Sequence, residues 1–317
     1  MALIHFNDDV MASVARYLRA KDLANLGQTC RRFGRAIEDN DLSFTEDVAR
    51  QRFESSASDK DIISMPKYGT RYARGETTHL ALLYELEQLR TPLIFNAFLG
   101  RGVEYHPSSL NDHSRLWIRT RCGHQTAICN HVMKGGKHCV IYEMFENGST
   151  GFLGIIRPIK RWNEKGLNSF DPIPADHQLH ENTINQLHSE RTSRWGESDV
   201  HCCTWSTVES ICLWSDWNGP AQMDTSLEGQ FNFDSCKIAM LLDLDEGTLT
   251  VFNLWWPTGD SMWPNRKKAV LKRGLSGEYC WMACTDTAGY DPCDIKIKRA
   301  NRLIPFLSDA DRDLTTV

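Results

Sequence analysis

The sequence predicts an α+β protein, in which a small N-terminal module of three helices is followed by an antiparallel β-sandwich. Over the first fifty positions apolar residues recur at three- and four-residue steps, which is helical periodicity. Further along the chain, short alternating or continuous apolar runs are separated by turn residues, as in antiparallel strands. A polar, serine-rich stretch, ESSASDKDIISM, separates the two patterns. We therefore expect a helical module (1–53), a linker with a connecting helix (54–90), a sandwich (91–300) and a polar tail (301–317).

The composition limits the class of protein. The 317 residues carry 36 Lys and Arg against 41 Asp and Glu, a net charge of −5, which argues against a nucleic-acid binder led by phosphate contacts. No apolar run approaches the roughly 20 residues of a membrane helix. The N-terminal MALIHFNDDVMA has acids where a signal peptide needs its apolar core. The 11 cysteines are irregularly spaced, as expected of buried thiols in a reducing compartment. We expect a cytoplasmic or nuclear protein.

Each helix of the module has a start signal and an apolar stripe. Asp8 or Asp9 caps the first helix, Asp22 opens the second, and a further helix begins at Thr45 and runs to Phe53. The stripes contain Val10, Val14, Tyr17 and Leu18 in the first helix, Leu23 and Leu26 in the second, and Cys30, Phe33 and Ile37 in the third. Three short helices bury little surface, so the module needs a partner or a neighbouring domain. The alternative is a bundle that merely packs onto the rest of the chain.

The same segment resembles an F-box. FNDDVMASVARYL, then after three residues DLANLGQTCRRFGRAIEDNDL, matches the family pattern over residues 6–42, including Thr29-Cys30-Arg31 at the family's spacing. It departs at Asn7, where the family usually has proline. The resemblance implies binding to a Skp-family adaptor and, through it, to a cullin–RING ubiquitin ligase. The implied adaptor contacts are Phe6, Val10, Met11, Val14, Leu18, Leu23, Leu26, Cys30, Arg31 and Phe33.

A connecting helix follows the polar stretch. Thr77 or Thr78 caps HLALLYELEQLR, and Pro92 ends it. Leu80 and Leu83 are expected to face inward. This helix either makes the junction between the modules rigid or packs loosely on the second domain, and we favour the second interpretation.

One stretch of the β region, IAMLLDLDEGTLTVF at 238–252, allows two readings. Asp243, Asp245 and Glu246 beside Gly247 suggest a calcium loop. The oxygen ligands that such a loop needs further on are absent, and apolar residues flank the acids on both sides. We therefore predict a hairpin with an acidic turn. The other expected strands are RLWIRTR, HCVIYEMFE, TGFLGIIRPI, YCWMAC and DIKIKR.

This hairpin is also similar to the core of a SPRY domain, and HCVIYEMFENGSTGFLGIIRP and GLSGEYCWMAC match other parts of that family's pattern. The resemblance covers about residues 91–299. It implies a non-catalytic sandwich that binds proteins or peptides through loops at one edge. After Phe252-Asn253 this chain departs from the family by inserting LWWPTGDSMWPNRKK.

Aromatic residues in these loops are the candidate target contacts, because exposed tryptophan often anchors an interface. They are Trp162, Trp214, Trp217, Trp255, Trp256, Trp263 and Tyr290. The proline and glycine around Trp255, Trp256 and Trp263 suit a loop. We expect this loop to lie beside the other aromatic residues; alternatively, it folds back over its own rings.

Two Cys/His-rich stretches suggest other chemistry. Between residues 122 and 139 the pairs Cys122/His124 and Cys129/His131 are spaced at i, i+2, and His138 precedes Cys139, whereas zinc favours C-x2-4-C and H-x3-5-H spacings. HCCTWSTVESICLW at 201–214 carries no nucleophile signature and is interpreted as a strand pair. No cofactor, metal or catalytic residue is expected. The favoured function is a substrate-recruiting ligase subunit. The alternatives are a SPRY scaffold whose degenerate F-box binds no adaptor and, more remotely, a Cys/His metalloenzyme.

Overall fold

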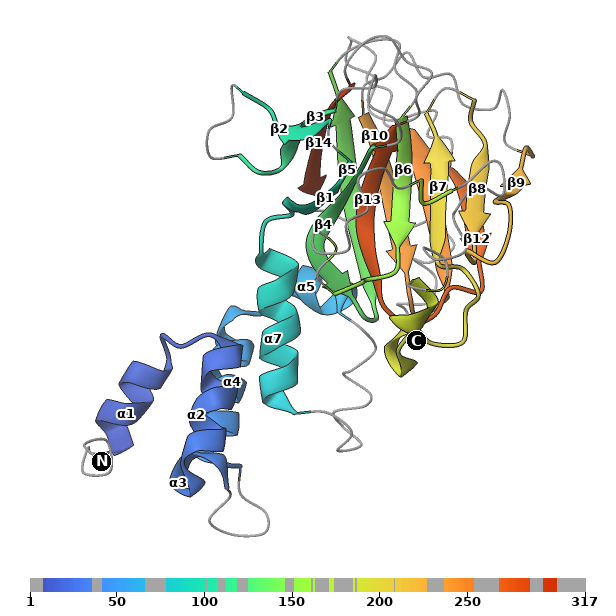
Figure 1. The fold of residues 1–317 in the computed structure, drawn as a ribbon. Helices are drawn as coiled ribbons and strands as arrows, with labels where there is room; N and C mark the ends of the chain where they lie inside the picture. The colour runs from blue at the N-terminus through green and yellow to red at the C-terminus, as the bar shows by residue number, and fades with distance from the viewer. Residues whose placement is uncertain are drawn as a thin grey trace, which may run out of the picture. The chain divides into compact units, whose positions relative to one another are not determined.

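The computed structural model describes residues 8–35, 42–65, 78–100, 102–107, 112–118, 125–145, 151–160, 162, 171–173, 185, 187–207, 209–226, 237–253, 268–285 and 293–300. The chain divides into two compact units, Met1–Thr91 and Pro92–Val317. The first is helical and the second is built of β-strands (Figure 1). This confirms the predicted α+β class. No helix in the described part of the chain is both long and apolar enough to cross a membrane.

The helices of the first unit are α1 (Asp8–Ala15), α2 (Ala20–Thr29), α3 (Arg31–Gly34), α4 (Phe44–Ser56), α5 (Asp59–Ser64) and α7 (His79–Arg90). The backbones of α2 and α3 lie in close contact. A Cβ added at Gly34 would lie 2.0 Å from the carbonyl oxygen of Gly27, far inside van der Waals contact. Glycine at position 34 therefore permits the close packing of these two helices.

The core of this unit includes α7. Leu83 of α7 packs in one buried cluster with Leu23 of α2 and Val48 of α4. The expectation that this helix packs loosely on the second domain was therefore wrong. The stretch at 54–65 also differs from a flexible connector, since α4 continues to Ser56 and α5 follows. α5 begins with a capping box, in which Ser58 and Asp61 bond to each other's backbone N–H groups.

Within the described residues, the second unit is a sandwich of two seven-stranded sheets (Figure 1). In strand order, sheet A is β1-β4-β13-β6-β7-β8-β9 and sheet B is β12-β11-β10-β5-β14-β3-β2. The strands are β1 (Phe95–Leu99), β2 (Val103–Tyr105), β3 (Arg115–Ile118), β4 (Gln125–Met133), β5 (Lys137–Met144), β6 (Gly151–Ile156), β7 (Cys202–Ser206), β8 (Cys212–Ser215), β9 (Gln222–Asp224), β10 (Lys237–Asp243), β11 (Thr248–Asn253), β12 (Lys268–Arg273), β13 (Tyr279–Thr285) and β14 (Cys293–Arg299). The strand pairs are antiparallel, for example β10 with β11 and β13 with β6.

The main core lies between the two sheets. Trp205 and Trp281 of sheet A pack in one buried cluster with Tyr142 and Met240 of sheet B. The Tyr142 hydroxyl donates a hydrogen bond to the carbonyl oxygen of Met282 across the core, at 3.0 Å. Because a buried phenol requires a hydrogen-bond partner, this contact fixes one sheet against the other.

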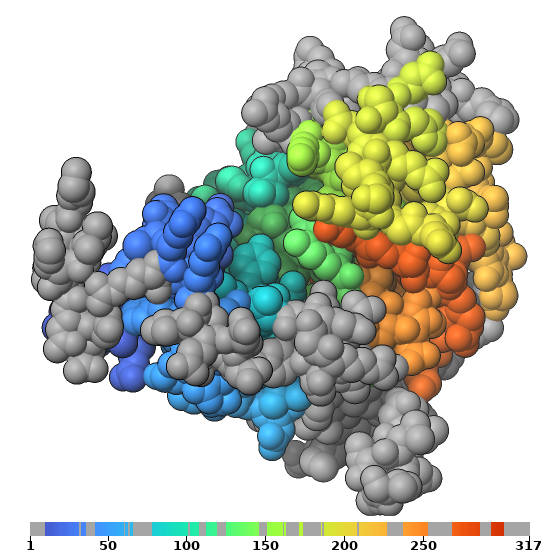
Figure 2. Space-filling model, turned by 90° about the horizontal axis from the view of Figure 1, so that it is seen from below, coloured from blue at the N-terminus to red at the C-terminus, as the bar shows by residue number. Residues whose placement is uncertain are grey.

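Sheet A is also covered on its outer face. Trp195, in the short 3-10 helix η4 (Ser193–Trp195), packs in a second buried cluster with Met282 of β13. The carbonyl oxygen of Arg194 accepts the N–H of Glu278 at 2.9 Å, which ties the segment to the start of β13. Figure 2 shows the yellow surface of this part of the chain beside the orange and red surface of residues 268–285. The central part of sheet A, around β13, is thus buried on both faces.

Candidate protein-interaction surfaces

Helix α1 exposes an apolar stripe. Val10, Val14 and Tyr17 are 47%, 54% and 90% exposed, whereas Met11 and Ala15, on another face of the same helix, are buried. Positions four residues apart lie on one side of a helix, so Val10 and Val14 form one stripe, which Tyr17 continues. The resemblance to an F-box implied that Val10 and Val14 contact an adaptor; their exposure is compatible with this role, which stays a prediction. Exposed apolar patches are a common feature of interaction sites, so this stripe is a candidate site.

The other predicted adaptor contacts differ in their exposure to solvent. Met11, Leu23 and Phe33 are buried, Leu18, Leu26 and Cys30 are half-buried, Arg31 is exposed, and Phe6 lies outside the described residues. The Phe33 ring packs on Phe44 of α4 with ring centroids 5.3 Å apart. The buried members therefore hold the module together, and the exposed stripe on α1 remains available to a partner.

Side chains of α4 and α7 fix the turn between α1 and α2. The Glu87 carboxylate accepts the N–H of Ala20, the first residue of α2, at 3.1 Å. Arg52 donates to Glu87 at 3.1 Å and also to the carbonyl oxygen of Leu18. A carboxylate at a helix N-terminus is favourable because it satisfies free N–H groups and opposes the helix dipole. The position of α1 thus depends on α7, a helix outside the matched F-box pattern.

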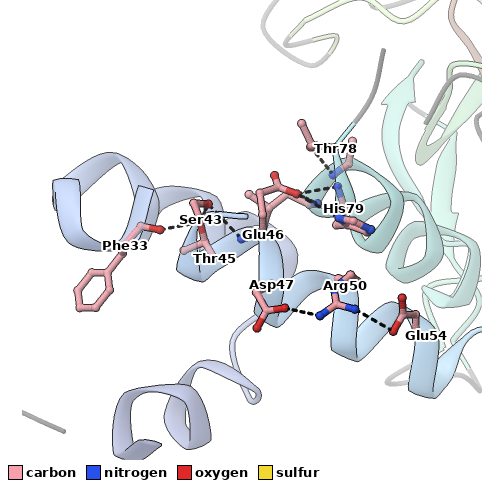
Figure 3. Close-up of polar contacts among 11 residues, drawn as sticks. Phe33, Ser43, Thr45, Glu46, Asp47, Arg50, Glu54, Thr78 and His79 are labelled. Carbon is pink, nitrogen blue, oxygen red and sulfur yellow. Dashed lines mark hydrogen bonds and ion pairs between the residues drawn. The ribbon is translucent and has the colours of Figure 1, made fainter. Parts of the chain in front are cut away.

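Helix α7 is itself capped from α4. Glu46 Oε2 accepts the N–H groups of His79 and Leu80 at 2.7 and 3.3 Å, and the Thr78 side chain accepts that of Ala81 at 3.2 Å (Figure 3). Burial lowers the pKa of His79 although the charge of Glu46 raises it. The predicted cap at Thr78 is confirmed, but the contribution of Glu46 is a tertiary contact that local sequence does not reveal.

The acidic turn between β10 and β11 is a hairpin turn, as predicted. Asp243 Oδ1 accepts the N–H groups of Asp245 and Glu246, both at 3.1 Å. Asp243 Oδ2 lies 3.1 Å from Lys137 Nζ, and Asp245 Oδ1 accepts the N–H of Gly136 at 3.2 Å. These contacts show that the carboxylates organise the turn and join it to the neighbouring β4–β5 connection. Within the described residues, no group of three His, Cys, Asp or Glu side chains could hold a metal ion.

The first Cys/His stretch lies partly on β4 and β5. His131 and His138 are buried with ring centroids 5.5 Å apart, and burial lowers their pKa values to about 2 and about 4. Burial also raises the pKa of the Cys129 thiol to about 11. These groups are therefore neutral at pH 7. Cys122 and His124 lie outside the described residues.

The second Cys/His stretch forms β7 and β8, which confirms the predicted strand pair. The His201 ring packs against Trp195 and Trp217, with centroids 5.1 Å away in each case, and burial lowers its pKa to about 4. Burial holds the pKa of Cys202 well above its ordinary value. A catalytic thiol needs a lowered pKa or an adjacent base, so this arrangement favours packing over nucleophilic chemistry.

Two of the predicted target contacts are buried. Trp217 has no exposed surface and its Nε1 donates to the carbonyl oxygen of Pro172 at 3.2 Å, and Trp162 is only 5% exposed. Trp214 is half-buried beneath Lys272, whose Nζ lies 3.7 Å from the ring centroid. The expectation that Trp162 and Trp217 present exposed rings was therefore wrong. Trp255, Trp256, Trp263 and Tyr290 lie outside the described residues.

Comparison with known protein families gives a match within the helical unit. Residues 8–45 match the F-box-like family. A comparison with curated proteins gave no match. Among solved structures, the chain is similar to the SPRY domain of human HERC1, with 8% identity, a TM-score of 0.37 and coverage of 64% of this chain and 95% of that one. It is also similar to the TRIM65 PSpry domain, with 13% identity, a TM-score of 0.40 and coverage of 68% and 97%.

Proposed function

We propose that this chain recruits a target protein to a cullin–RING (SCF-type) ubiquitin ligase in the cytoplasm or nucleus. In this proposal the F-box-like module binds a Skp-family adaptor and the sandwich binds the target. The observation that carries it is the exposed apolar stripe of α1, which lies inside the segment that matches the F-box-like family. Holding two proteins together raises their effective concentration, so such a subunit needs no catalytic group of its own.

The stripe is large enough to contribute to a stable contact. Burying a valine side chain that was exposed is worth about 1.5–3 kcal/mol, and aromatic residues such as tyrosine are frequent anchors at interfaces. Val10, Val14 and Tyr17 start partly exposed, so together they would supply about 4 kcal/mol. The half-buried Leu18 and Leu26 would add to this contact from the neighbouring turn and helix.

The alternative is a scaffold that binds partners through its sandwich but no longer binds an adaptor. The departure at Asn7 favours this alternative, because proline at that position would fix the entry to the first helix. The two possibilities differ in one measurable property, which is adaptor binding by the intact chain.

The test is co-purification of the full chain with a Skp-family adaptor. Val14→Asp places a charge in the centre of the stripe and is expected to reduce adaptor binding at least tenfold. Ala81→Asp, an equivalent change on the exposed side of α7, is the matched control and should bind normally. Both variants must give the parent's circular dichroism spectrum. Failure of the parent to bind any Skp-family adaptor would support the scaffold alternative.

The target is identified with the same variant. Proteins captured by the parent and by Val14→Asp are compared by mass spectrometry. A target of the sandwich should be captured by both, whereas ligase subunits should be lost with Val14→Asp.

A further inference from the structure

The outer face of sheet B carries an apolar patch. In β5, β10 and β11, Val140, Met240 and Val251 point into the main core. The residues that alternate with them therefore point to the outer face, away from sheet A. Four of these outward-facing residues form a separate buried cluster, which we call the sheet B patch: Cys139, Ala239, Leu241 and Phe252.

The patch is buried although it lies on the outer face. Cys139 and Leu241 are 6% and 8% exposed, whereas Val270, on the same face at the edge of the sheet, is 41% exposed. An antiparallel sheet commonly leaves one face to solvent, so burial of the patch requires a second layer. The described apolar side chains that pack beside it, Ile141 and Ala300, belong to β5 and to the end of β14 and do not form such a layer.

The last described residue, Ala300, lies next to this patch. Its N–H donates to the carbonyl oxygen of Cys139 at 3.1 Å. The register of the sheet places Leu241 beside Cys139 on the next strand, and Thr250 beside Leu241 on the strand after that. A row of outward-facing positions therefore runs from Ala300 across β5, β10 and β11.

The sequence that follows Ala300 suits this position. Residues 301–307 read NRLIPFL and contain four large apolar side chains, whereas residues 308–317, SDADRDLTTV, are mostly polar. Neighbouring strands lie about 4.8 Å apart, so the path from β14 over β5 and β10 to β11 is about 14 Å long. Seven extended residues span about 23 Å, which is enough to cross the whole patch.

We propose that residues 301–307 lie across the outer face of sheet B and cover the sheet B patch. The occupant is apolar, as the patch is, and it follows Ala300 directly, so no long loop has to be closed to bring it there. Glu143, which pairs with Lys237 and Lys298 on the same face, marks the polar limit of the patch.

This inference goes beyond the proposed function and does not depend on adaptor binding. It assigns the outer face of sheet B to the chain itself. A target protein would then contact the sandwich elsewhere.

The accessibility of the Cys139 thiol tests the proposal, because this thiol belongs to the patch. The full chain is treated with iodoacetamide under native conditions, and mass spectrometry follows the alkylation of each cysteine. Burial raises the pKa of the Cys139 thiol, and the thiolate is the reactive form, so alkylation in the parent should be slow. Deletion of residues 301–317 should accelerate it about tenfold. Deletion of residues 308–317 removes only the polar part and, as the matched control, should leave the rate unchanged.

Two further measurements separate local uncovering from unfolding. The Cys203 thiol is buried in the main core, and its alkylation should stay slow in both deletions. Leu303→Ser combined with Phe306→Ser keeps the length of the chain and should give an intermediate rate at Cys139. Equal acceleration at Cys139 and Cys203 in this variant and in the deletion of residues 301–317 would mean that the whole sandwich is lost, and would overturn the proposal.

An equal rate at Cys139 in the parent and in the deletion of residues 301–317 would also overturn it. A slow rate in both would show that another part of the chain covers the patch. A fast rate in both would show that the face is open to a partner.

The free heptapeptide NRLIPFL, added to the chain that lacks residues 301–317, tests direct binding. A tethered segment has an effective concentration of about 1 mM, so tenfold protection in the parent corresponds to a Kd of about 0.1 mM for the peptide. At about 1 mM the peptide should therefore restore slow alkylation of Cys139. A peptide with Ser in place of its four apolar residues should not. Acceleration that NRLIPFL fails to reverse would contradict direct covering of the patch by this segment.

Discussion

Glu46→Ala is expected to loosen α7 and, with it, the helical unit. Glu46 accepts two backbone N–H groups at the start of this helix, those of His79 and Leu80, at 2.7 and 3.3 Å. Loss of a helix cap costs about 0.5–2 kcal/mol, and a hydrogen bond to a charged group is worth about 1.5–3 kcal/mol. Since water replaces part of the lost interaction, we expect a loss of about 2 kcal/mol.

Hydrogen exchange measured by mass spectrometry reports this loss directly at α7. A cost of about 2 kcal/mol corresponds to about thirtyfold faster exchange of amides in the first turn of α7, because 1.4 kcal/mol is a factor of ten. Glu46→Gln keeps an acceptor oxygen but removes the charge, so it should give an intermediate rate. Adaptor binding should also weaken, because α7 carries Glu87, which caps α2.

Glu54→Ala is the matched control. Glu54 lies on the same helix, is more exposed than Glu46 and contacts Arg50 at 3.8 Å, so its removal should leave exchange in α7 unchanged. If Glu46→Ala and Glu54→Ala exchange at the same rate, the cap does not stabilise α7 and the reasoning fails.

Two further predictions concern the sandwich. Asp243→Asn retains the acceptor Oδ1 that bonds to Asp245 and Glu246, so the melting temperature of the variant should change little and should not respond to calcium. If calcium raises the melting temperature of the parent but not that of the variant, the hairpin interpretation is contradicted. His138 has a folded-state pKa of about 4 because of burial, against an ordinary value of 6.5. The unfolded chain therefore binds the proton first, and this residue should lower stability by about 1.4 kcal/mol per pH unit as pH falls from about 6.5 to about 4. Urea unfolding at pH 7 and pH 5 measures this slope, and His138→Phe should reduce it; an equal slope in that variant would mean that other groups cause it.

The strands that the sequence predicted are those with a clear apolar pattern. RLWIRTR, for example, contains β3, and the predicted hairpin IAMLLDLDEGTLTVF covers most of β10 and β11. β4 was harder to recognise because Cys129, His131 and their neighbours suggested metal chemistry. β4 itself is covered on both faces, so most of its side chains are buried and alternation of polar and apolar residues is weak.

Helical periodicity located α1 but not the direction of its apolar stripe. A stripe of valines has the same pattern whether it faces the core or a partner. In this protein the small residue Ala15 and Met11 face the core, and Val10 and Val14 face outward. The F-box resemblance supplied the missing information, because it implied that the first helix contacts an adaptor.

The positions of the tryptophans depend on long-range topology. Trp217 and Trp162 follow strands of sheet A and have polar, proline-containing neighbours, so their local sequence resembles that of surface loops. Their burial comes from the crossing of the chain over the outer face of sheet A, where Trp195 also packs. Local composition cannot indicate whether such a segment projects from a sandwich or covers it. Tryptophan rings in this covering layer therefore stabilise the sheet. Any target contact on the described part of the sandwich must use side chains that reach solvent, such as Phe145 or Met223.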